Sequence, residues 1–109
     1  MENKQNHKIS SEEVVKVMKK LHVDFDFLYH DPEKFPELFG KWMEVELEHG
    51  TKYGMKQTNV TNDDPTYTAM IVIAHVTEIP DYYERLYDME KIGDDYWKNK
   101  KKPHILHSF

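Results

Sequence analysis

Apolar residues near the start of the chain recur at the spacing of a helix. Ser10 or Ser11, followed by two glutamates, is typical of a helix start, because a hydroxyl caps free backbone amides and acids favour the first turn. The apolar positions that follow lie three or four residues apart: Val14, Val15, Met18 and Leu21. Residues 24–31 lack this period, and we expect their large apolar side chains to anchor an irregular connector in the core: Phe25, Phe27, Leu28 and Tyr29.

A second helix is predicted after Pro32 and Pro36, because proline is tolerated in the first turn of a helix and not in its interior. One face of this helix carries the following residues: Leu38, Phe39, Trp42, Val45, Glu46 and His49. Gly50 is placed to end the helix as a left-handed terminal residue. Residues 51–64 show no period and are rich in Asn, Thr and Gly, which predicts a loop of a length that is usually functional or mobile.

The segment 67–79 is apolar on nearly every side, which predicts a central helix. Asp63 or Asp64 is expected to cap this helix, with Pro65 at its first position. The β-branched run at residues 71–73 leaves a strand as the alternative at that point.

A last helix is predicted after Pro80, from its expected cap Asp81 to Gly93 or the charged tail. The core-facing stripe of this helix is expected among the following residues: Tyr82, Tyr83, Leu86, Tyr87, Met89 and Glu90. The four helices together predict an all-α fold, a single small domain over residues 1–97 packed around the segment 67–79. Residues 98–109 form a basic C-terminal tail in this scheme.

The charge is unevenly distributed along the 109 residues. All 20 acids and 11 of the 15 bases lie in residues 1–97, which carry a charge of −9, whereas the last twelve residues carry four lysines and no acid. Such an acidic body with one arginine argues against nucleic-acid binding. The tail is a solvated terminus, a nuclear-import signal or a patch that binds an anionic surface. The absence of cysteine excludes thiolate metal sites and disulfides. No apolar stretch is long enough for a membrane span or a signal peptide, so we expect a cytoplasmic protein.

Two pairs of charged residues fall on the apolar stripes of the second and third helices. Glu46 and His49 are three residues apart, and His75 and Glu78 repeat this spacing in reverse order. Residues three apart share a helix face, and carboxylate-rich helical bundles bind iron or manganese through this spacing. The sequence therefore predicts a site for zinc, iron or manganese with Glu46, His49, His75 and Glu78 as ligands, and Glu90 as an additional candidate.

Each of these residues also has an ordinary interpretation. His49, next to Gly50, complements the negative end of a helix dipole, and Glu78 is placed to accept from backbone amides of the next helix. His75 is then a buried histidine with an ordinary hydrogen bond. The neighbouring Glu44 and Glu48 are expected on a solvated face.

The charged pairs belong to a longer pattern. Its parts, in order, are Glu46-Leu-Glu-His49-Gly50, Thr58-Asn-Val-Thr-Asn-Asp-Asp-Pro65, Ala74-His75, Glu78-Ile-Pro80-Asp-Tyr82-Tyr83, Arg85-Leu86 and Met89-Glu90. With this pattern, residues 44–90, and more loosely the predicted helix at residues 10–21, resemble a family of small uncharacterised proteins of bacteria, bacteriophages and large DNA viruses that is defined as a domain of unknown function. The resemblance implies a small, mainly helical domain and supplies no catalytic residue.

Three functions are compatible with these observations. The first is metal binding at the four predicted ligands, with a metal-activated water as the reactive species if the site is catalytic. The second is a non-catalytic viral or phage accessory or structural protein that contacts a protein partner or a second copy through its Tyr-rich surface or the loop 51–64. The third is binding of a small metabolite in a pocket under that loop. In the second and third cases, the four residues form a structural polar network.

Overall fold

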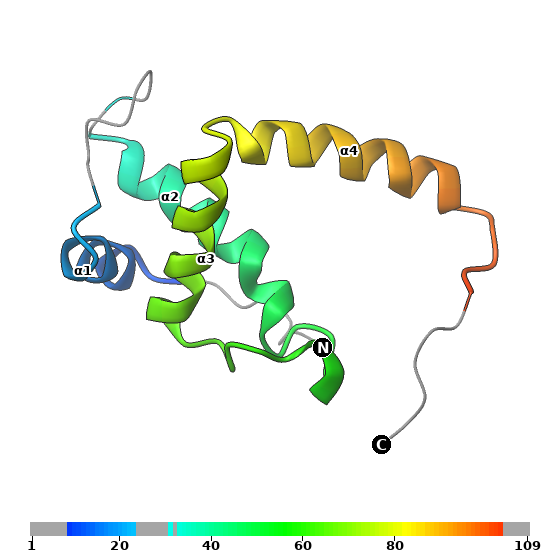
Figure 1. Cartoon of the computed structure of the whole chain (residues 1–109), viewed down its shortest axis with the longest axis horizontal. Helices are drawn as coiled ribbons and strands as arrows, with labels where there is room; N and C mark the ends of the chain where they lie inside the picture. The colour runs from blue at the N-terminus through cyan, green and yellow to red at the C-terminus, as the bar shows by residue number, and fades with distance from the viewer. Residues whose placement is uncertain (1–8, 24–30, 32, 104–109) are drawn as a thin grey trace.

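A computed structural model describes residues 9–23, 31 and 33–103 of the chain. The described part contains α-helices and short 3-10 helices but no strand, so the predicted all-α class is confirmed and the strand alternative at residues 71–73 is wrong (Figure 1). The elements are α1 (Ser11–Lys20), α2 (Phe35–Val45), η1 (Glu46–His49), η2 (Lys56–Thr58), α3 (Pro65–Glu78) and α4 (Tyr82–Trp97). The expected connector anchors lie outside the described residues: Phe25, Phe27, Leu28 and Tyr29.

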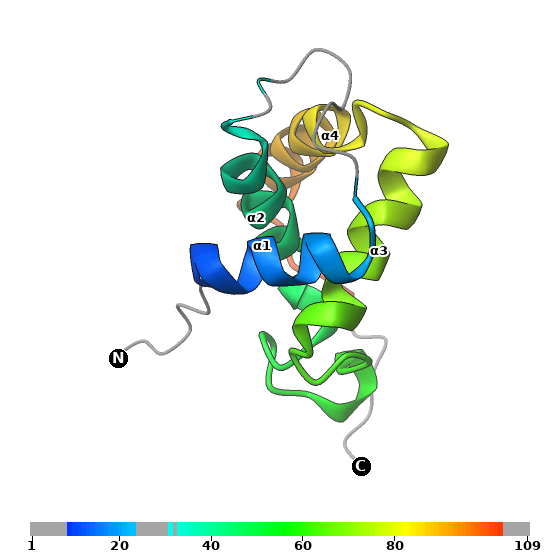
Figure 2. The same ribbon diagram turned by 90° about the vertical axis from the view of Figure 1, so that its left-hand side faces the viewer.

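The first helix, α1, begins as its sequence predicts. Ser10 Oγ accepts a 3.2 Å hydrogen bond from the amide of Glu13, and two lysines occupy the last turn. The buried side chains of α1 are Val14, Val17 and Met18. Val15, which the pattern placed in the same stripe, is only half-buried. Through the buried face, α1 contacts both α2 and α3, across which it lies in Figure 2.

The second helix, α2, supplies the aromatic part of the core. The ring of Phe35 meets those of Phe39 and Trp42 edge-on, at centroid distances of 6.0 and 5.8 Å. This arrangement is favoured because the positive edge of one ring faces the negative face of the other. A Cβ at Gly40 would lie 3.1 Å from Cγ2 of Val14, so glycine at this position allows α1 to approach α2 closely.

The third helix, α3, contacts α1, α2 and α4, which gives it the central place that the sequence predicts. Asp64 caps it by accepting hydrogen bonds from the amides of Thr66 and Tyr67, at 2.8 and 3.2 Å. Burial is confined to one face of the helix, since Tyr67 and Met70 are 58% and 49% exposed. The buried residues of that face are Thr68, Ala69 and Val72.

Only the first turns of α4 belong to the core, where Tyr83 is buried and Leu86 packs at its edge. Beyond them the helix extends past the other helices (Figure 1). It continues through Gly93 to Trp97, so its end lies at the charged tail. No helix in the part of the chain that the structure describes is long and apolar enough to cross a membrane.

The start of α4 differs from the prediction. Asp81 occupies the cap position but makes no capping hydrogen bond with its side chain. Its carboxylate accepts a 2.9 Å hydrogen bond from Nε of Arg85, one turn later. The acid at this position therefore stabilises the helix through an ion pair on its surface rather than through its free amides.

Candidate functional site

Glu46 and His49 lie immediately after α2, in the 3-10 helix η1, rather than in the α-helix that the pattern predicts. The prediction that their side chains share a face nevertheless holds, because residues three apart eclipse one another in a 3-10 helix. η1 also packs against α3, and this contact brings His75 to the same place. Three of the four predicted ligands, Glu46, His49 and His75, therefore lie together.

The carboxylate of Glu46 is the centre of this cluster. Its side chain is only 2% exposed, and its two oxygens face different groups. Oε1 lies 3.2 Å from Nε2 of His49, whereas Oε2 lies 3.4 Å from Nε2 of His75. Oε2 also accepts a 2.6 Å hydrogen bond from the hydroxyl of Tyr83. One buried carboxylate thus joins η1, α3 and α4.

The two oxygens of Glu46 differ in how well they are satisfied. Oε1 is buried and has no hydrogen-bond partner among the described residues, although the imidazole of His49 lies within ion-pair distance. A buried carboxylate oxygen without a donor is unfavourable, because it has lost its water and gained nothing in return. A positive charge beside Oε1 would remove this cost.

Aromatic rings hold the groups around Oε2 in place. Burial raises the pKa of the Tyr83 hydroxyl well above its usual value, and the hydrogen bond to Glu46 raises it further, so this group remains a donor. The Tyr83 ring stacks on Trp42 at a centroid distance of 5.2 Å and an angle of 15°. The ring of Tyr82 stacks on His75 at 3.9 Å and 5°, which fixes the plane of the imidazole.

Two further acids, Glu48 and Glu90, border the cluster. Oε2 of Glu48, which was expected on a solvated face, lies 3.8 Å from Nε2 of His49. Ligand atoms of Glu46, Glu48 and His49 all lie within 4.8 Å of one another. Partial burial raises the pKa of the Glu90 carboxyl, and the charges of Glu48 and Asp94 raise it further. Glu90, the additional candidate ligand, is therefore within electrostatic reach of this group.

Glu78, the fourth predicted ligand, is exposed at the end of α3. Within the described part of the chain, its carboxylate makes no hydrogen bond or ion pair with the Glu46 cluster. Glu48 and Tyr83 are the residues that sequence reasoning missed. The signal for Tyr83 was its place in an apolar stripe, because a buried tyrosine hydroxyl needs a partner. Glu48 gave no signal, because residues two apart do not face each other on an α-helix.

The loop 51–64 returns to its own start beside η1. The amides of residues 60 and 61 both donate to the carbonyl oxygen of His49, at 2.6 and 3.0 Å. Oδ1 of Asp63 accepts a 2.9 Å hydrogen bond from the amide of Thr51. These bonds close the loop at its base and fix the backbone of His49.

Gly50 has a different role from the one predicted. Its φ of −111° lies outside the left-handed region that a helix-ending glycine adopts. Glycine is needed for space, because a Cβ at this position would overlap Oδ1 of Asp63 and lie 3.0 Å from its amide nitrogen. Asp63 is therefore part of the loop closure, and Asp64 alone caps α3.

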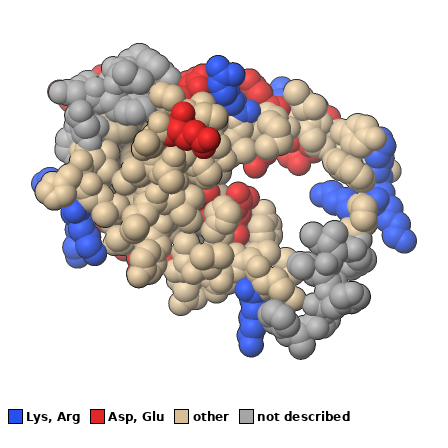
Figure 3. Space-filling model, in the orientation of Figure 1, with Lys and Arg blue, Asp and Glu red and all other residues tan. Residues whose placement is uncertain are grey.

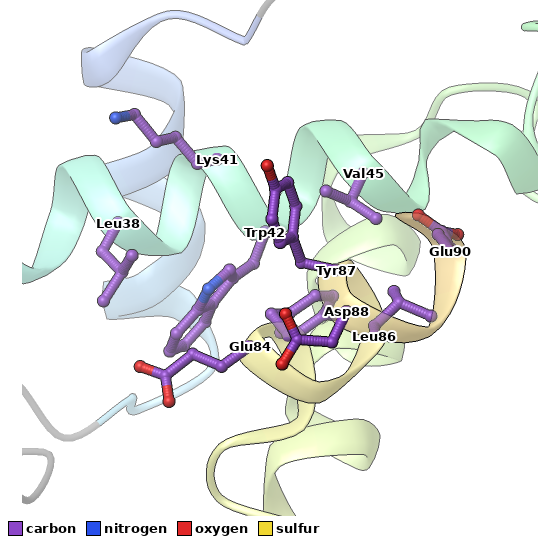
Figure 4. A pocket seen from close by; sticks show the side chains of 10 residues that line it. Leu38, Lys41, Trp42, Val45, Glu84, Leu86, Tyr87, Asp88 and Glu90 are labelled. Carbon is purple, nitrogen blue, oxygen red and sulfur yellow. The ribbon is translucent and has the colours of Figure 1, made fainter. Parts of the chain in front are cut away.

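A pocket of about 440 Å³ lies between α2 and α4, and no residue of the loop 51–64 lines it (Figure 4). Trp42 and Tyr83, which also support Glu46, belong to its lining. The other apolar lining residues are Leu38, Val45, Leu86 and Tyr87. The charged ones are Lys41, Glu84, Asp88 and Glu90.

A family model described as "Protein of unknown function (DUF5661)" matches residues 14–92. The chain belongs to this family. The DUF5661 match spans α1 to the middle of α4 and contains every residue of the Glu46 cluster. The predicted membership in a family of unknown function is thus confirmed, over a longer stretch than residues 44–90. No curated protein and no solved structure matches the chain.

Proposed function

We propose that this DUF5661 domain binds a divalent metal ion through Glu46, Glu48 and His49. The observation that carries the proposal is the buried Oε1 of Glu46, which lacks a hydrogen-bond donor among the described residues and faces an imidazole nitrogen. A cation at this point supplies the missing positive charge and offsets the repulsion between the carboxylates.

The distances between the three groups support a shared ion. In a tetrahedral site with bonds of about 2.0–2.1 Å, neighbouring ligand atoms lie about 3.4 Å apart. Oε1 of Glu46 and Nε2 of His49 are 3.2 Å apart, and Glu48 approaches the same nitrogen at 3.8 Å. Three protein ligands leave a fourth position for water. Two carboxylates and an imidazole suit zinc, iron or manganese, the metals expected from the sequence.

His75 and Tyr83 take the role of positioning residues in this proposal. Both contact Oε2 of Glu46, and they therefore orient the carboxylate so that Oε1 points toward the ion. Loss of such an outer contact typically weakens metal binding by about 10–100-fold. Glu78 has no place in the proposed ligand set.

Isothermal titration calorimetry of the untagged full chain with Zn²⁺, Mn²⁺ and Fe²⁺ tests the proposal. Substituting His104 and His107 of the tail with alanine beforehand removes a competing source of imidazole. We expect one equivalent of at least one metal to bind, and this binding to be lost in Glu46→Gln and in His49→Ala. The same metal should raise the melting temperature of the parent protein alone, because a ligand that binds the folded state stabilises it.

Matched variants separate the proposed site from adventitious binding. His22→Ala, which removes an exposed histidine at the end of α1, and Glu78→Gln are both expected to bind metal as the parent does. His75→Ala is expected to weaken binding without abolishing it. The proposal is wrong if none of the three metals binds, or if binding survives in folded Glu46→Gln and His49→Ala proteins.

The pocket between α2 and α4 favours a second candidate function, binding of a small apolar molecule. Its volume lies within the usual range for ligand sites, about 300–1,000 Å³. In a Trp97→Phe variant, Trp42 is the remaining tryptophan and reports on its own pocket by fluorescence. Anilinonaphthalene sulfonate is expected to change this fluorescence, and Val45→Glu to prevent the change. This function is rejected if anilinonaphthalene sulfonate binds the Val45→Glu variant as well as it binds the Trp97→Phe parent.

A further inference from the structure

The second half of α4 carries a row of apolar side chains that the rest of the described chain leaves exposed. We call Met89, Ile92, Tyr96 and Trp97 the α4 face. Met89, Ile92 and Tyr96 are 59%, 71% and 59% exposed, and Trp97 is 37% exposed. This face continues the side on which Leu86 packs against the core, because residues three, four or seven apart lie on one side of a helix. Exposed apolar groups that extend a core face in this way are typical of an interface.

The α4 face is large enough for a weak dimer. A large side chain has a surface area of about 200 Å². The exposed fractions of the four side chains therefore amount to about 450 Å² of apolar surface in each copy. Two copies therefore bury about 900 Å² of apolar surface, and the flanking polar groups bring the total to about the lower limit of specific interfaces, near 1,200 Å². An open gap beneath the second half of α4 leaves this part of the helix accessible (Figure 3).

The charges of α4 indicate how two copies would align. The acids lie in one stretch of the helix: Glu84, Asp88, Glu90, Asp94 and Asp95. The lysines follow it: Lys98, Lys100, Lys101 and Lys102. Figure 3 shows acidic side chains over α4 and lysines at its far end. In an antiparallel pair centred on residue 93, Lys98 of each copy lies level with Asp88 of the other, and the lysines that follow lie toward its Glu84. A parallel pair instead places all like charges together.

We propose that the α4 face binds the α4 face of a second copy of this chain, antiparallel and around a two-fold axis. The contact is then self-complementary in its apolar row and at its two ends, where lysines of one copy meet Asp88 and Glu84 of the other, as a two-fold interface requires. It is independent of the metal site, because none of the proposed ligands belongs to the α4 face.

Sedimentation equilibrium of the full chain, from micromolar to submillimolar concentration, tests the proposal. We expect a reversible monomer–dimer equilibrium that weakens as salt is added, because exposed charges are screened. Ile92→Glu is expected to raise the dissociation constant at least about tenfold, since it places an unpaired charge in the apolar row. Met89→Glu should have the same effect. Both side chains are exposed, so helix content and melting temperature of the monomer should stay unchanged.

The matched control lies one residue away. Lys91→Glu introduces the same side chain in the same turn of α4 but on the opposite side of the helix, and the dimer should persist. The proposal is wrong if the wild-type chain remains a monomer at all concentrations. It is also wrong if Ile92→Glu and Met89→Glu dimerise as the wild type does, since the interface then lies elsewhere.

Discussion

Replacing Tyr83 with phenylalanine removes one hydrogen bond from the buried carboxylate of Glu46 and changes little else. The hydroxyl lost in this variant donates to Oε2 of Glu46 at 2.6 Å. The phenylalanine ring keeps the stacking on Trp42 and the edge-on contact with Tyr82. The variant therefore measures the hydrogen bond with the packing held constant.

The expected loss follows from the surroundings of the carboxylate. A hydrogen bond to a charged group contributes about 1.5–3 kcal/mol, and a buried acceptor left unsatisfied adds to the loss. Oε1 of Glu46 has no donor among the described residues, so the carboxylate is already poorly satisfied, while His75 at 3.4 Å gives partial compensation. We expect a loss of about 2 kcal/mol, which lowers the melting temperature of a domain of this size by about 9 °C.

Circular dichroism at 222 nm, followed during urea and thermal unfolding, measures this loss. Tyr82→Phe is the matched control, because the structure shows no hydrogen bond of the Tyr82 hydroxyl with any described residue, and its cost should be about 0.5 kcal/mol or less. In a Glu46→Gln background, Tyr83→Phe should cost about 1 kcal/mol less than in the wild type, because the acceptor is then neutral. Equally small losses of stability in the two tyrosine variants, or an unchanged cost of Tyr83→Phe in the Glu46→Gln background, would show that the hydrogen bond to Glu46 does not stabilise the fold.

Three further predictions concern the loop, the cap of α3 and the acids near the site. Gly50→Ala should cost about 1–3 kcal/mol in the free energy of unfolding by overlap with Asp63; an equal loss in an Asp63→Ala background would contradict this steric cause. Asp64→Ala should cost about 1 kcal/mol, because two amides at the start of α3 lose their acceptor; an unchanged urea midpoint would count against the cap. Glu90→Gln should raise the melting temperature at neutral pH but not well below pH 4.5. Because the pKa of Glu90 is raised in the folded state, ionisation of this carboxyl at neutral pH opposes folding, and at low pH the carboxyl is neutral in both states. Since Glu90 is largely exposed, the gain should be about 0.5 kcal/mol or less, and an equal gain at both pH values would reject the electrostatic cause.

The helices were predictable where their ends depend on nearby residues alone. Ser10 and Asp64 cap α1 and α3 as the sequence indicates, because capping needs only a short acceptor beside free amides. Asp81 fails as a cap because its backbone, at φ −99° and ψ 33°, lies outside the extended region that Ser10 and Asp64 adopt, and its carboxylate binds Arg85 instead. Gly50 was identified as a special position for the wrong reason, since the group that demands its small size, Asp63, comes from the far end of a loop.

The sequence could predict which candidate site residues share a helix face, but not which helices meet at the site. The spacing of Glu46 and His49 placed both on one face, and His75 met them because α3 packs on η1. Glu78 has the same spacing from His75 but does not reach the cluster. The spacing specifies which face of α3 both residues share, but not which turn of that face contacts η1. Tyr83 depends on how α4 docks against α2, which no local pattern of residues specifies.

The closed base of the loop 51–64 has a consequence for how this chain can vary. Residues 52–57 are exposed, and Gly54, with φ of 67°, has no atom within 4 Å of the position of a Cβ. Added residues at this tip cost little beyond loop-closure entropy, about 0.6 kcal/mol for each doubling of loop length. Homologues should therefore tolerate insertions here before anywhere in the helices. A fluorescent peptide inserted after Gly54 would give an optical probe a few residues from His49 while leaving the hydrogen bonds at the base of the loop intact.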